Sequence, residues 1–411
     1  MSKYVIIGGS IAAIGTIEGI RSVDKNGDIT LVTDENHFIY SRPLISYLVE
    51  GKTTLEKMRY REDDFYIKNN VEVIKGTKAE KIDYENKCIV LNNKRNIPFE
   101  KLMIATGSSP FTPHIEGEEK VKNKFTFMSL DDALNLEKAI TKDSKVLILG
   151  AGLIGLKCAE AINNKVKNVT VVDLADRILP SILDEKGCKL VQKHIEKQGV
   201  KFILGNSIDK IDEKQATLKD GSKLDYDIFV VAVGVRPNVN LAEEIGCEVN
   251  RGIITDEHGM TTLKDIYAAG DCTASYDITR NQNIILALLP NAYFKGETAG
   301  VNMAGGEKSY KNAMPMNSLG LFGLHMVTAG NYDGEEYIVE NEDEYKKLVY
   351  KDNLLKGFII IGNVDKAGIY TYLIREKVNL SDIDFDLIKD NPGLMAFSRD
   401  YRDSKLGGKK L

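Results

Sequence analysis

Two segments of this 411-residue chain share one pattern, in which an apolar strand runs into a turn of small residues, a helix and a second strand. The first unit covers residues 3–33 and the second covers residues 145–172. Each unit predicts a βαβ crossover and therefore a parallel sheet. The units begin too far apart for a single nucleotide-binding sheet, so the chain is predicted to contain two separate Rossmann-like domains.

The second unit carries the clearer glycine motif. Gly150, Gly152 and Gly155 follow the strand and open the helix, and Asp173 lies at the end of the next strand. These glycines allow a tight turn, close approach of a pyrophosphate to the backbone, and close packing of helix on strand. The phosphates would bind at the helix N-terminus, while Asp173 would bind the adenosine ribose and repel a 2′-phosphate. The motif predicts NADH, with NADPH less favoured, and Arg177 is close enough to soften that preference. The alternative is a glycine turn without a ligand.

The first unit has a weaker form of the motif. Gly8 keeps the first glycine, whereas Ser10 and Ala13 replace the second and third. Small side chains still permit close approach, and the acids Asp34 and Glu35 follow the second strand. Taken alone, this motif fits a dinucleotide and a plain turn equally. The pairing with the second motif favours a second dinucleotide.

The rest of the chain can be assigned around these units. Strands are expected over residues 71–74, 88–91 and 102–105, then 201–204 and 228–233, with a hairpin over 216–224. Residues 252–271 and a helix over 291–304 fit the first domain resuming after an inserted second domain. The predicted fold is α/β: a first domain over 1–115 and 250–327, an inserted domain over 116–249, and a C-terminal α+β domain over 328–411, with a mobile tail over 404–411.

Charge and composition exclude several classes of function. A net charge of −5 and a pI near 5.8 argue against nucleic acid as a partner. No apolar run approaches the roughly 20 residues that span a bilayer, and the chain begins directly with a strand. We therefore expect a cytoplasmic protein without a membrane segment. The 5 cysteines form no C-x-x-C pair and the 5 histidines show no ligand spacing, so neither a dithiol centre nor a metal site is predicted.

Three further motifs make the chain resemble a known family. They are the turns at residues 105–107 (Ala-Thr-Gly) and 234–237 (Gly-Val-Arg-Pro), and the segment 262–271 ending in Ala-Ala-Gly-Asp. With the two glycine motifs, they resemble the FAD-dependent pyridine nucleotide-disulfide oxidoreductase superfamily over residues 1–325. The resemblance implies FAD in the first domain and NADH in the inserted domain, with a C-terminal domain that covers the flavin.

The resemblance also implies roles for single residues. Asp271 would bind the FAD ribityl chain, and Pro290 and Asn291 would place a helix N-terminus at the flavin pyrimidine edge. The FAD set is Gly8, Ser10, Ala13, Asp34, Glu35, Arg42, Thr106, Gly107, Asp271, Pro290 and Asn291. The NAD set is Gly150, Gly152, Gly155, Asp173 and Gly234.

Residues 40–52 distinguish subgroups of the superfamily. In the NADH oxidase, NADH peroxidase and coenzyme A disulfide reductase members, a reactive cysteine aligns at about Pro43, and this chain has none there. Its Ser-Arg-Pro sequence instead resembles rubredoxin reductases and the flavoprotein part of nitrite reductase large subunits, in which the basic residue contacts FAD. We assign that contact to Arg42, whose planar guanidinium suits a phosphate or flavin oxygen. A solvated surface arginine is the alternative.

The missing cysteine leads to a functional prediction. Hydride would pass from NADH to FAD, and the electrons would then leave directly to an iron-sulfur carrier such as rubredoxin or ferredoxin. Two alternatives stay open: an NADH oxidase that reduces oxygen at the flavin, and an electron-transfer flavoprotein subunit of a larger iron-sulfur complex. The chain could also form a homodimer.

A few residues depart from the family pattern or have no clear role. Lys157 stands where related reductases often have a glutamate near the nicotinamide; it could pair with carboxylates, alter nicotinamide placement or point to solvent. Cys158 and Cys272 are expected to be packing residues. The acidic segment 335–344 is expected to be a solvated face. The basic cluster of Arg399, Arg402, Lys405, Lys409 and Lys410 is expected to be a solvated tail, with weak contact to an acidic carrier as the alternative.

Overall fold

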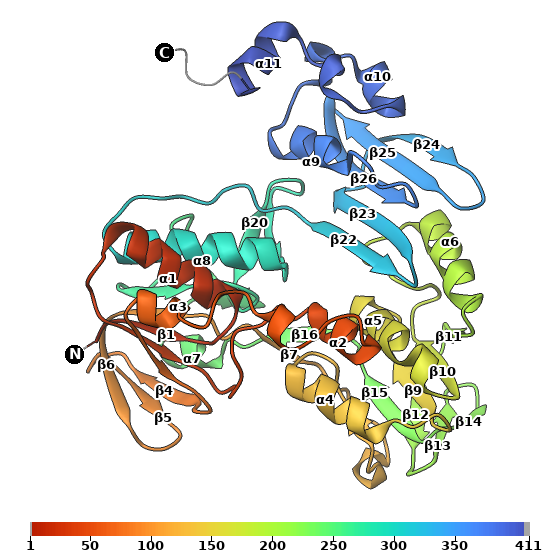
Figure 1. Ribbon diagram of the computed structural model, residues 1–411, viewed down its shortest axis with the longest axis horizontal. Coiled ribbons are helices and arrows are strands. Elements are labelled where there is room, and N and C mark those ends of the chain that lie inside the picture. The colour runs from red at the N-terminus through yellow and green to blue at the C-terminus, as the bar shows by residue number, and fades with distance from the viewer. Residues whose placement is uncertain (1, 407–411) are drawn as a thin grey trace.

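The computed structural model of the protein describes residues 2–406 (Figure 1). Its first sheet has the parallel strand order β3-β2-β1-β6-β19. These strands are β3 (Val71–Ile74), β2 (Ile29–Val32), β1 (Ser2–Ile7), β6 (Asn96–Ile104) and β19 (Ile266–Ala268). Because β19 pairs with β6, the chain returns to the first domain after the inserted one.

Two helices pack closely against each other on this sheet. In Figure 1, α1 (Ile11–Val23) and α8 (Leu289–Met303) lie side by side. A Cβ at Gly296 of α8 would lie 2.2 Å from the carbonyl oxygen of Ala12 in α1, so only glycine permits this approach. The contact fixes the N-terminal end of α8 relative to the glycine turn that precedes α1.

The inserted domain repeats the arrangement. Its sheet is parallel, in the order β11-β10-β9-β15-β8, and buries a continuous apolar core. The strands are β11 (Lys201–Leu204), β10 (Asn168–Asp173), β9 (Lys145–Leu149), β15 (Ile228–Val231) and β8 (Lys124–Phe125), and the helices are α4 (Leu130–Ala139), α5 (Leu153–Ile162) and α6 (Glu185–Glu196). The predicted α/β fold with two Rossmann-like domains is therefore confirmed.

Each parallel sheet is accompanied by a small antiparallel meander. Strand β5 (Cys88–Leu91) pairs with the first half of β6 on one side and with β4 (Ala79–Asp83) on the other. Strands β12 (Ile208–Ile211), β13 (Gln215–Leu218) and β14 (Lys223–Asp225) form the counterpart. The shared layout extends the internal repeat beyond the two βαβ units. Short hairpins complete the first domain: β17 (Val249–Asn250) with β18 (Gly252–Ile253), and β20 (Ala274–Asp277) with β21 (Gln282–Ile285).

The structure moves the predicted boundary at residue 249. A two-stranded connection, β7 (Ser108–Pro110) with β16 (Val235–Pro237), joins the two domains. After it, α7 (Asn240–Glu244) packs back on the first domain, and Ala242 and Cys247 lie in that domain's core. Residues 238–249 therefore belong with the first domain, because their apolar side chains are buried there.

The boundary predicted at residue 328 is also wrong. It falls inside β23 (Leu324–Gly330), which pairs with β22 (Met316–Leu321) in the C-terminal sheet, so this domain begins near residue 316. The remaining strands are β26 (Leu354–Ile361), β25 (Tyr345–Lys351) and β24 (Glu335–Glu340), and the helices are α9 (Ala367–Arg375), α10 (Phe385–Asp390) and α11 (Arg399–Leu406). The predicted tail overlaps α11, and residues 407–411 lie outside the described part.

The C-terminal sheet packs directly on the inserted domain. Asp184, the N-cap of α6, accepts hydrogen bonds from the Tyr345 hydroxyl at 2.6 Å and from the Lys347 ammonium at 3.1 Å. Burial opposes the charge of Asp184, but these donors outweigh it and lower its pKa. The C-terminal sheet is therefore bonded to the inserted domain, which is predicted to bind NADH. The same sheet also faces the first domain. No helix among residues 2–406 combines the length and apolar character needed to cross a membrane.

Candidate dinucleotide and electron-transfer site

A crevice of about 420 Å³ opens at the carboxyl ends of β1, β2 and β6, where Rossmann-like sheets bind their ligands. Gly8, Asp34 and Thr106 line it, so three residues of the predicted FAD set meet in one place. The structure adds lining residues that sequence reasoning missed: Thr77, Lys78, Ala79, Glu80, Ser109 and Asn238. For Thr77, Lys78 and Ser109 the signal in the sequence is position alone, because these residues come after strands β3 and β6, which end at this edge. Asn238 instead follows the short strand at residues 235–237.

The glycine turn of the first motif has the geometry of a phosphate cradle. Gly8 has φ +114°, and a Cβ there would lie 2.0 Å from the carbonyl oxygen of Ala105. Ser10 is the N-cap of α1, yet its side chain makes no capping hydrogen bond. The first N–H groups of α1 are therefore available to an anion. Ala13 is fully buried and lets α1 pack closely on the sheet.

The two acids after β2 have different surroundings. Asp34 lines the crevice, whereas Glu35 forms an ion pair with Arg42 and accepts a 2.9 Å hydrogen bond from the Tyr40 hydroxyl. Burial opposes the charge of Arg42, but Tyr40 and Glu35 outweigh it and raise the pKa of its guanidinium. Arg42 is thus held in an inward-facing network, which argues against a freely solvated side chain.

Asp271 lies close to this network. The Ser108 hydroxyl donates a hydrogen bond of 3.3 Å to its carboxylate, and burial raises the pKa of Asp271. Gly107, which directly precedes Ser108, has φ +65° with open space where a Cβ would point. A buried carboxylate with one donor can accept further hydrogen bonds, which suits the hydroxyls of a ribityl chain.

The N-terminus of α8 supplies an unsatisfied donor. Pro290 lies in the first turn of the helix, and Asn291 next to it is 6% exposed. Its side-chain oxygen accepts a 2.8 Å hydrogen bond from the Tyr310 hydroxyl, while its side-chain nitrogen is buried with no partner. Such a nitrogen is unfavourable unless a ligand satisfies it. The first-domain residues therefore fit FAD, whose flavin carbonyls are hydrogen-bond acceptors.

The second glycine motif leaves room for a pyrophosphate. Gly150 has φ +116°, and a Cβ at Gly155 would lie 2.0 Å from the carbonyl oxygen of Gly150. Gly152 is the N-cap of α5, and a Cβ there would meet nothing within 4 Å. Gly234 also faces open space, with φ +110°. The residues fit a dinucleotide seated over the N-terminus of α5.

Asp173 is oriented by this loop. Its two carboxylate oxygens accept hydrogen bonds from the backbone N–H of Ala151 at 2.6 Å and of Ala175 at 2.8 Å. A carboxylate has about four acceptor positions, so it can still bind ribose hydroxyls. Arg177 pairs with Asp176 at 3.1 Å. This exposed pair leaves the predicted effect of Arg177 on the preference for NADH as a prediction.

Lys157 does not point to solvent. Its ammonium forms an ion pair with Glu160, lies 4.5 Å from the ring centroid of Tyr47 on α2 (Leu44–Glu50), and donates to the carbonyl oxygen of Gly320 at 3.2 Å. The three elements involved belong to three different domains. Of the three interpretations, pairing with a carboxylate is the one the structure shows.

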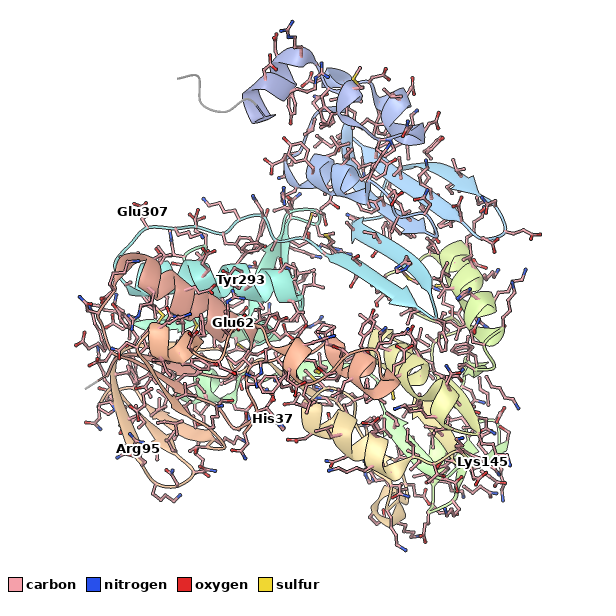
Figure 2. All side chains as sticks on the ribbon, viewed as in Figure 1. His37, Glu62, Arg95, Lys145, Tyr293 and Glu307 are labelled. Atoms are coloured by element: carbon pink, nitrogen blue, oxygen red, sulfur yellow. The ribbon has the colours of Figure 1, made fainter. Side chains whose placement is uncertain are left out.

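The first and inserted domains meet along the segment that follows β2. Figure 2 shows His37 near this boundary, where its ring nitrogen lies 2.8 Å from the Asp131 carboxylate of α4. The Tyr40 hydroxyl accepts a hydrogen bond of 2.8 Å from the backbone of Leu130. Residues 37–42 therefore touch both domains beside the first dinucleotide crevice.

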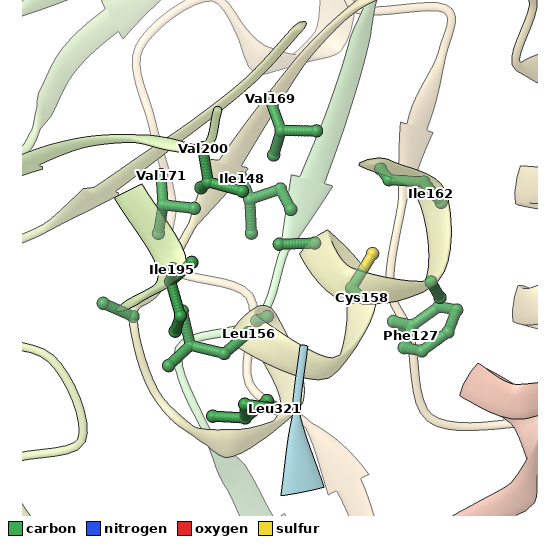
Figure 3. Packing of buried hydrophobic residues seen from close by; sticks show 14 of the residues in the cluster. Phe127, Ile148, Leu156, Cys158, Ile162, Val169, Val171, Ile195, Val200 and Leu321 are labelled. Atoms are coloured by element: carbon green, nitrogen blue, oxygen red, sulfur yellow. The ribbon is translucent and has the colours of Figure 1, made fainter. Parts of the chain in front are cut away.

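None of the cysteines has the surroundings of a reactive thiol. Figure 3 shows Cys158 among apolar side chains of the inserted domain, including Phe127 and Leu156. Burial raises the pKa of every cysteine thiol in the chain, to about 11 for Cys188. Thiolates are the nucleophilic form, so raised pKa values make these groups poor nucleophiles. Pro43, where relatives place a cysteine, is the N-cap of α2.

Two family matches complete this picture. Residues 2–296 match the family described as pyridine nucleotide-disulphide oxidoreductase. The chain belongs to this family. Residues 315–378 match a second family, described as the rubredoxin NAD+ reductase C-terminal domain. The predicted enzyme class, an FAD-dependent NAD(P)H oxidoreductase, is confirmed for this family member.

Individual relatives share most of the chain. It is 30% identical over 395 residues to the NADH-dependent phenylglyoxylate dehydrogenase subunit epsilon of Aromatoleum evansii, covering 93% of each chain. It is 30% identical over 392 residues to a nitrite reductase of Bacillus subtilis, covering 92% of this chain but 48% of that protein. This chain therefore spans about half the length of the nitrite reductase. The covalent putidaredoxin reductase-putidaredoxin complex has a TM-score of 0.87 at 21% identity, covering 95% of this chain and 96% of that one, and shows the shared fold.

The two charged segments noted in the sequence contain ion pairs. The acidic segment 335–344 is largely an exposed face, as expected, and within it Glu336 and Glu340 pair with Lys347 and Lys186. In the basic cluster, Arg399 lies 3.7 Å from Asp403 on α11, while Lys409 and Lys410 lie outside the described residues. Residues 2–406 contain no group of three His, Cys, Asp or Glu side chains placed to hold a metal ion.

Proposed function

We propose that this family member takes hydride from NADH and delivers electrons to an iron-sulfur carrier of the rubredoxin or ferredoxin type without using a cysteine. The observation that carries the proposal is the state of the thiols. All five have raised pKa values, and none occupies the segment at Pro43. The C-terminal match to rubredoxin NAD+ reductases supports the choice of carrier.

The two cofactor sites divide the task between the domains. FAD, when bound, accepts the hydride as an electron pair and can release its electrons one at a time. Gly8, Asp34, Asp271 and the α8 N-terminus at Asn291 would hold it. Gly152 and Asp173 would hold the pyrophosphate and adenosine ribose of NADH. The same assignment extends to Ser10, Ala13, Glu35, Arg42, Thr106, Gly107, Pro290, Gly150, Gly155 and Gly234.

The chain's own residues orient these groups. Arg42 and Glu35 form an ion pair close to Asp271, and this pair would hold the segment after β2 beside the FAD site. Lys157 lies on α5, whose N-terminus would bind NADH. Its side chain contacts Tyr47 of α2 and β22, so it holds α5 against these two elements. We assign it a positioning role without contact to the reacting atoms, because its ammonium is already engaged by Glu160.

A second candidate function is favoured by one comparison. The relative from Aromatoleum evansii, which matches over nearly the whole chain, is named as a subunit of a dehydrogenase. The chain would then pass electrons from NADH into a larger iron-sulfur complex, or pass electrons from that complex to NAD+. A homodimer is the other predicted assembly, and a cytoplasmic location is part of the same proposal. Sedimentation of the purified protein, alone and with its candidate partners, separates these assemblies.

The proposal is tested by comparing electron acceptors. Purified protein loaded with FAD is mixed with NADH and rubredoxin or a ferredoxin under anaerobic conditions, and oxygen consumption is measured separately in air. We expect the carrier to be reduced faster than oxygen at equal acceptor concentration. Oxygen reduction that matches or exceeds carrier reduction would contradict the proposal and favour the NADH oxidase alternative.

A further inference from the structure

A buried lysine lies on the helix that is expected to face the flavin. Lys295 of α8 is 8% exposed. Its ammonium donates three hydrogen bonds: to the Thr273 hydroxyl at 2.7 Å, to the backbone oxygen of Ala274 at 2.9 Å and to the Ser275 hydroxyl at 3.2 Å. All three donors of the ammonium are therefore used by uncharged acceptors.

This cation has no carboxylate partner among residues 2–406. Its hydrogen bonds all go to neutral oxygens. Burial lowers the pKa of Lys295 to about 8. A buried charge without an opposite charge is unfavourable for the fold, and perturbed groups of this kind concentrate at functional sites. Lys295 thus holds a buried charge that its hydrogen-bond partners do not neutralise.

The acceptors connect Lys295 to the turn that carries Asp271. The Thr273 hydroxyl, which accepts from Lys295, donates in turn to the carbonyl oxygen of Gly270 at 2.7 Å. Gly270 has φ +87° and directly precedes Asp271. A chain of two hydrogen bonds therefore ties the middle of α8 to the Gly-Asp turn.

Helix geometry directs the ammonium toward the flavin end of α8. Asn291 and Lys295 are four residues apart, so they lie on the same face, separated by about 6 Å along the axis. Side chains of a helix lean toward its N-terminus. Lys295 therefore places its charge on the face of α8 that carries the buried, unpartnered nitrogen of Asn291, one helical turn further into the helix.

We propose that Lys295 is a positioning residue that ties α8 to the Asp271 turn and supplies the positive charge that stabilises reduced FAD. The inference rests on the proposed function and goes beyond it by naming a group that sets the flavin potential. Hydride transfer converts NADH to NAD+ and adds two electrons and one proton to FAD, so the reduced flavin carries one more negative charge than the oxidised form. Lys295 compensates that charge without gaining or losing a bond.

The test compares the midpoint potential of bound FAD among variants, measured against a reference dye, together with the dissociation constant of oxidised FAD. Lys295→Met should weaken binding of reduced FAD at least tenfold more than binding of oxidised FAD, which lowers a two-electron potential by about 30 mV or more. Lys295→Arg, which keeps the charge, should restore most of the potential. Lys311→Met is the matched control, because Lys311 is exposed and paired with Glu257; it should leave the potential unchanged.

The inference is overturned if Lys295→Met binds FAD and has the potential of the wild-type protein. A loss of FAD affinity that is equal for both redox states would also overturn the electrostatic role, because a purely structural effect is the same for both. If Lys295→Met does not fold, Lys295→Gln removes the charge while keeping two donors and gives the same readout. Failure of the wild-type protein to bind FAD, or to be reduced by NADH, would instead contradict the proposed function.

Discussion

Removing the charge of Lys157 should destabilise the junction of the three domains. Its partner Glu160 is 7% exposed and has one other donor, the backbone N–H of Phe322 at 2.6 Å. Lys157→Met would leave this buried carboxylate with that single donor, and breaking a buried pair in this way costs about 3–5 kcal/mol of unfolding free energy. Part of this loss, about 0.5–2 kcal/mol, is the cation–π contact with Tyr47.

The assay is urea unfolding followed by far-ultraviolet circular dichroism, since the chain has no tryptophan. The double variant Lys157→Met with Glu160→Gln removes both charges and keeps an acceptor for Phe322, so it should regain at least about 1 kcal/mol over Lys157→Met alone. Lys165→Met is the control, because the Lys165–Glu137 pair is more exposed and should contribute less than about 1 kcal/mol. A Lys157→Met variant within about 0.5 kcal/mol of the wild type, or a double variant no more stable than the single one, would refute the reasoning.

Three further predictions concern the two sites. Gly152→Ala should leave the unfolding free energy within about 0.5 kcal/mol, since the added Cβ meets nothing within 4 Å. The same methyl group should raise the KM for NADH about tenfold or more by occupying pyrophosphate space, and an unchanged KM in steady-state assays would contradict the site. Asp173→Ser should shift the ratio of kcat/KM for NADPH over NADH upward by about tenfold, and a constant ratio would remove Asp173 from cofactor selection. Burial lowers the pKa of Lys295 to about 8, so the unfolded chain binds more protons above that pH. Relative to Lys295→Met, the FAD-free wild-type protein should therefore gain stability between pH 8 and 10, on the order of 2–3 kcal/mol. The difference in unfolding free energy between the two proteins should shift by this amount across the range in urea titrations, and a difference that stays constant with pH would contradict this pKa.

The parts of the fold that were predictable depend on local rules. Gly8 and Gly150 mark their turns because each has φ above +110° and each would clash if it carried a Cβ. The apolar strands next to these turns alternate with helices, and this alternation predicts two parallel sheets. The crevice residues at the carboxyl edges follow from the same topology, which is why Asp34 and Thr106 lie in one crevice with Gly8.

The parts that could not be predicted depend on contacts between distant segments. Strand β22 pairs with β23, and no local signal in the sequence separates them from the preceding domain, so the boundary was set too late. Lys157 contacts Tyr47 and Gly320, which are far from it in the chain. Lys295 lies on a helix where a lysine is ordinarily exposed. Its contacts are instead with residues 273–275, in and next to β20, which accept its hydrogen bonds and lie far from it in the chain.

The central claim is that electrons leave this protein through the flavin without passing through a thiol. An anaerobic titration of the FAD-loaded protein with NADH tests it most directly, because NADH carries two electrons and FAD accepts two. The account predicts that one equivalent of NADH bleaches the flavin completely, that no further NADH is oxidised, and that added rubredoxin or ferredoxin restores the flavin absorbance. Oxidation of a second equivalent of NADH, with the number of free thiols rising by two, would show a redox-active cysteine pair and contradict the account.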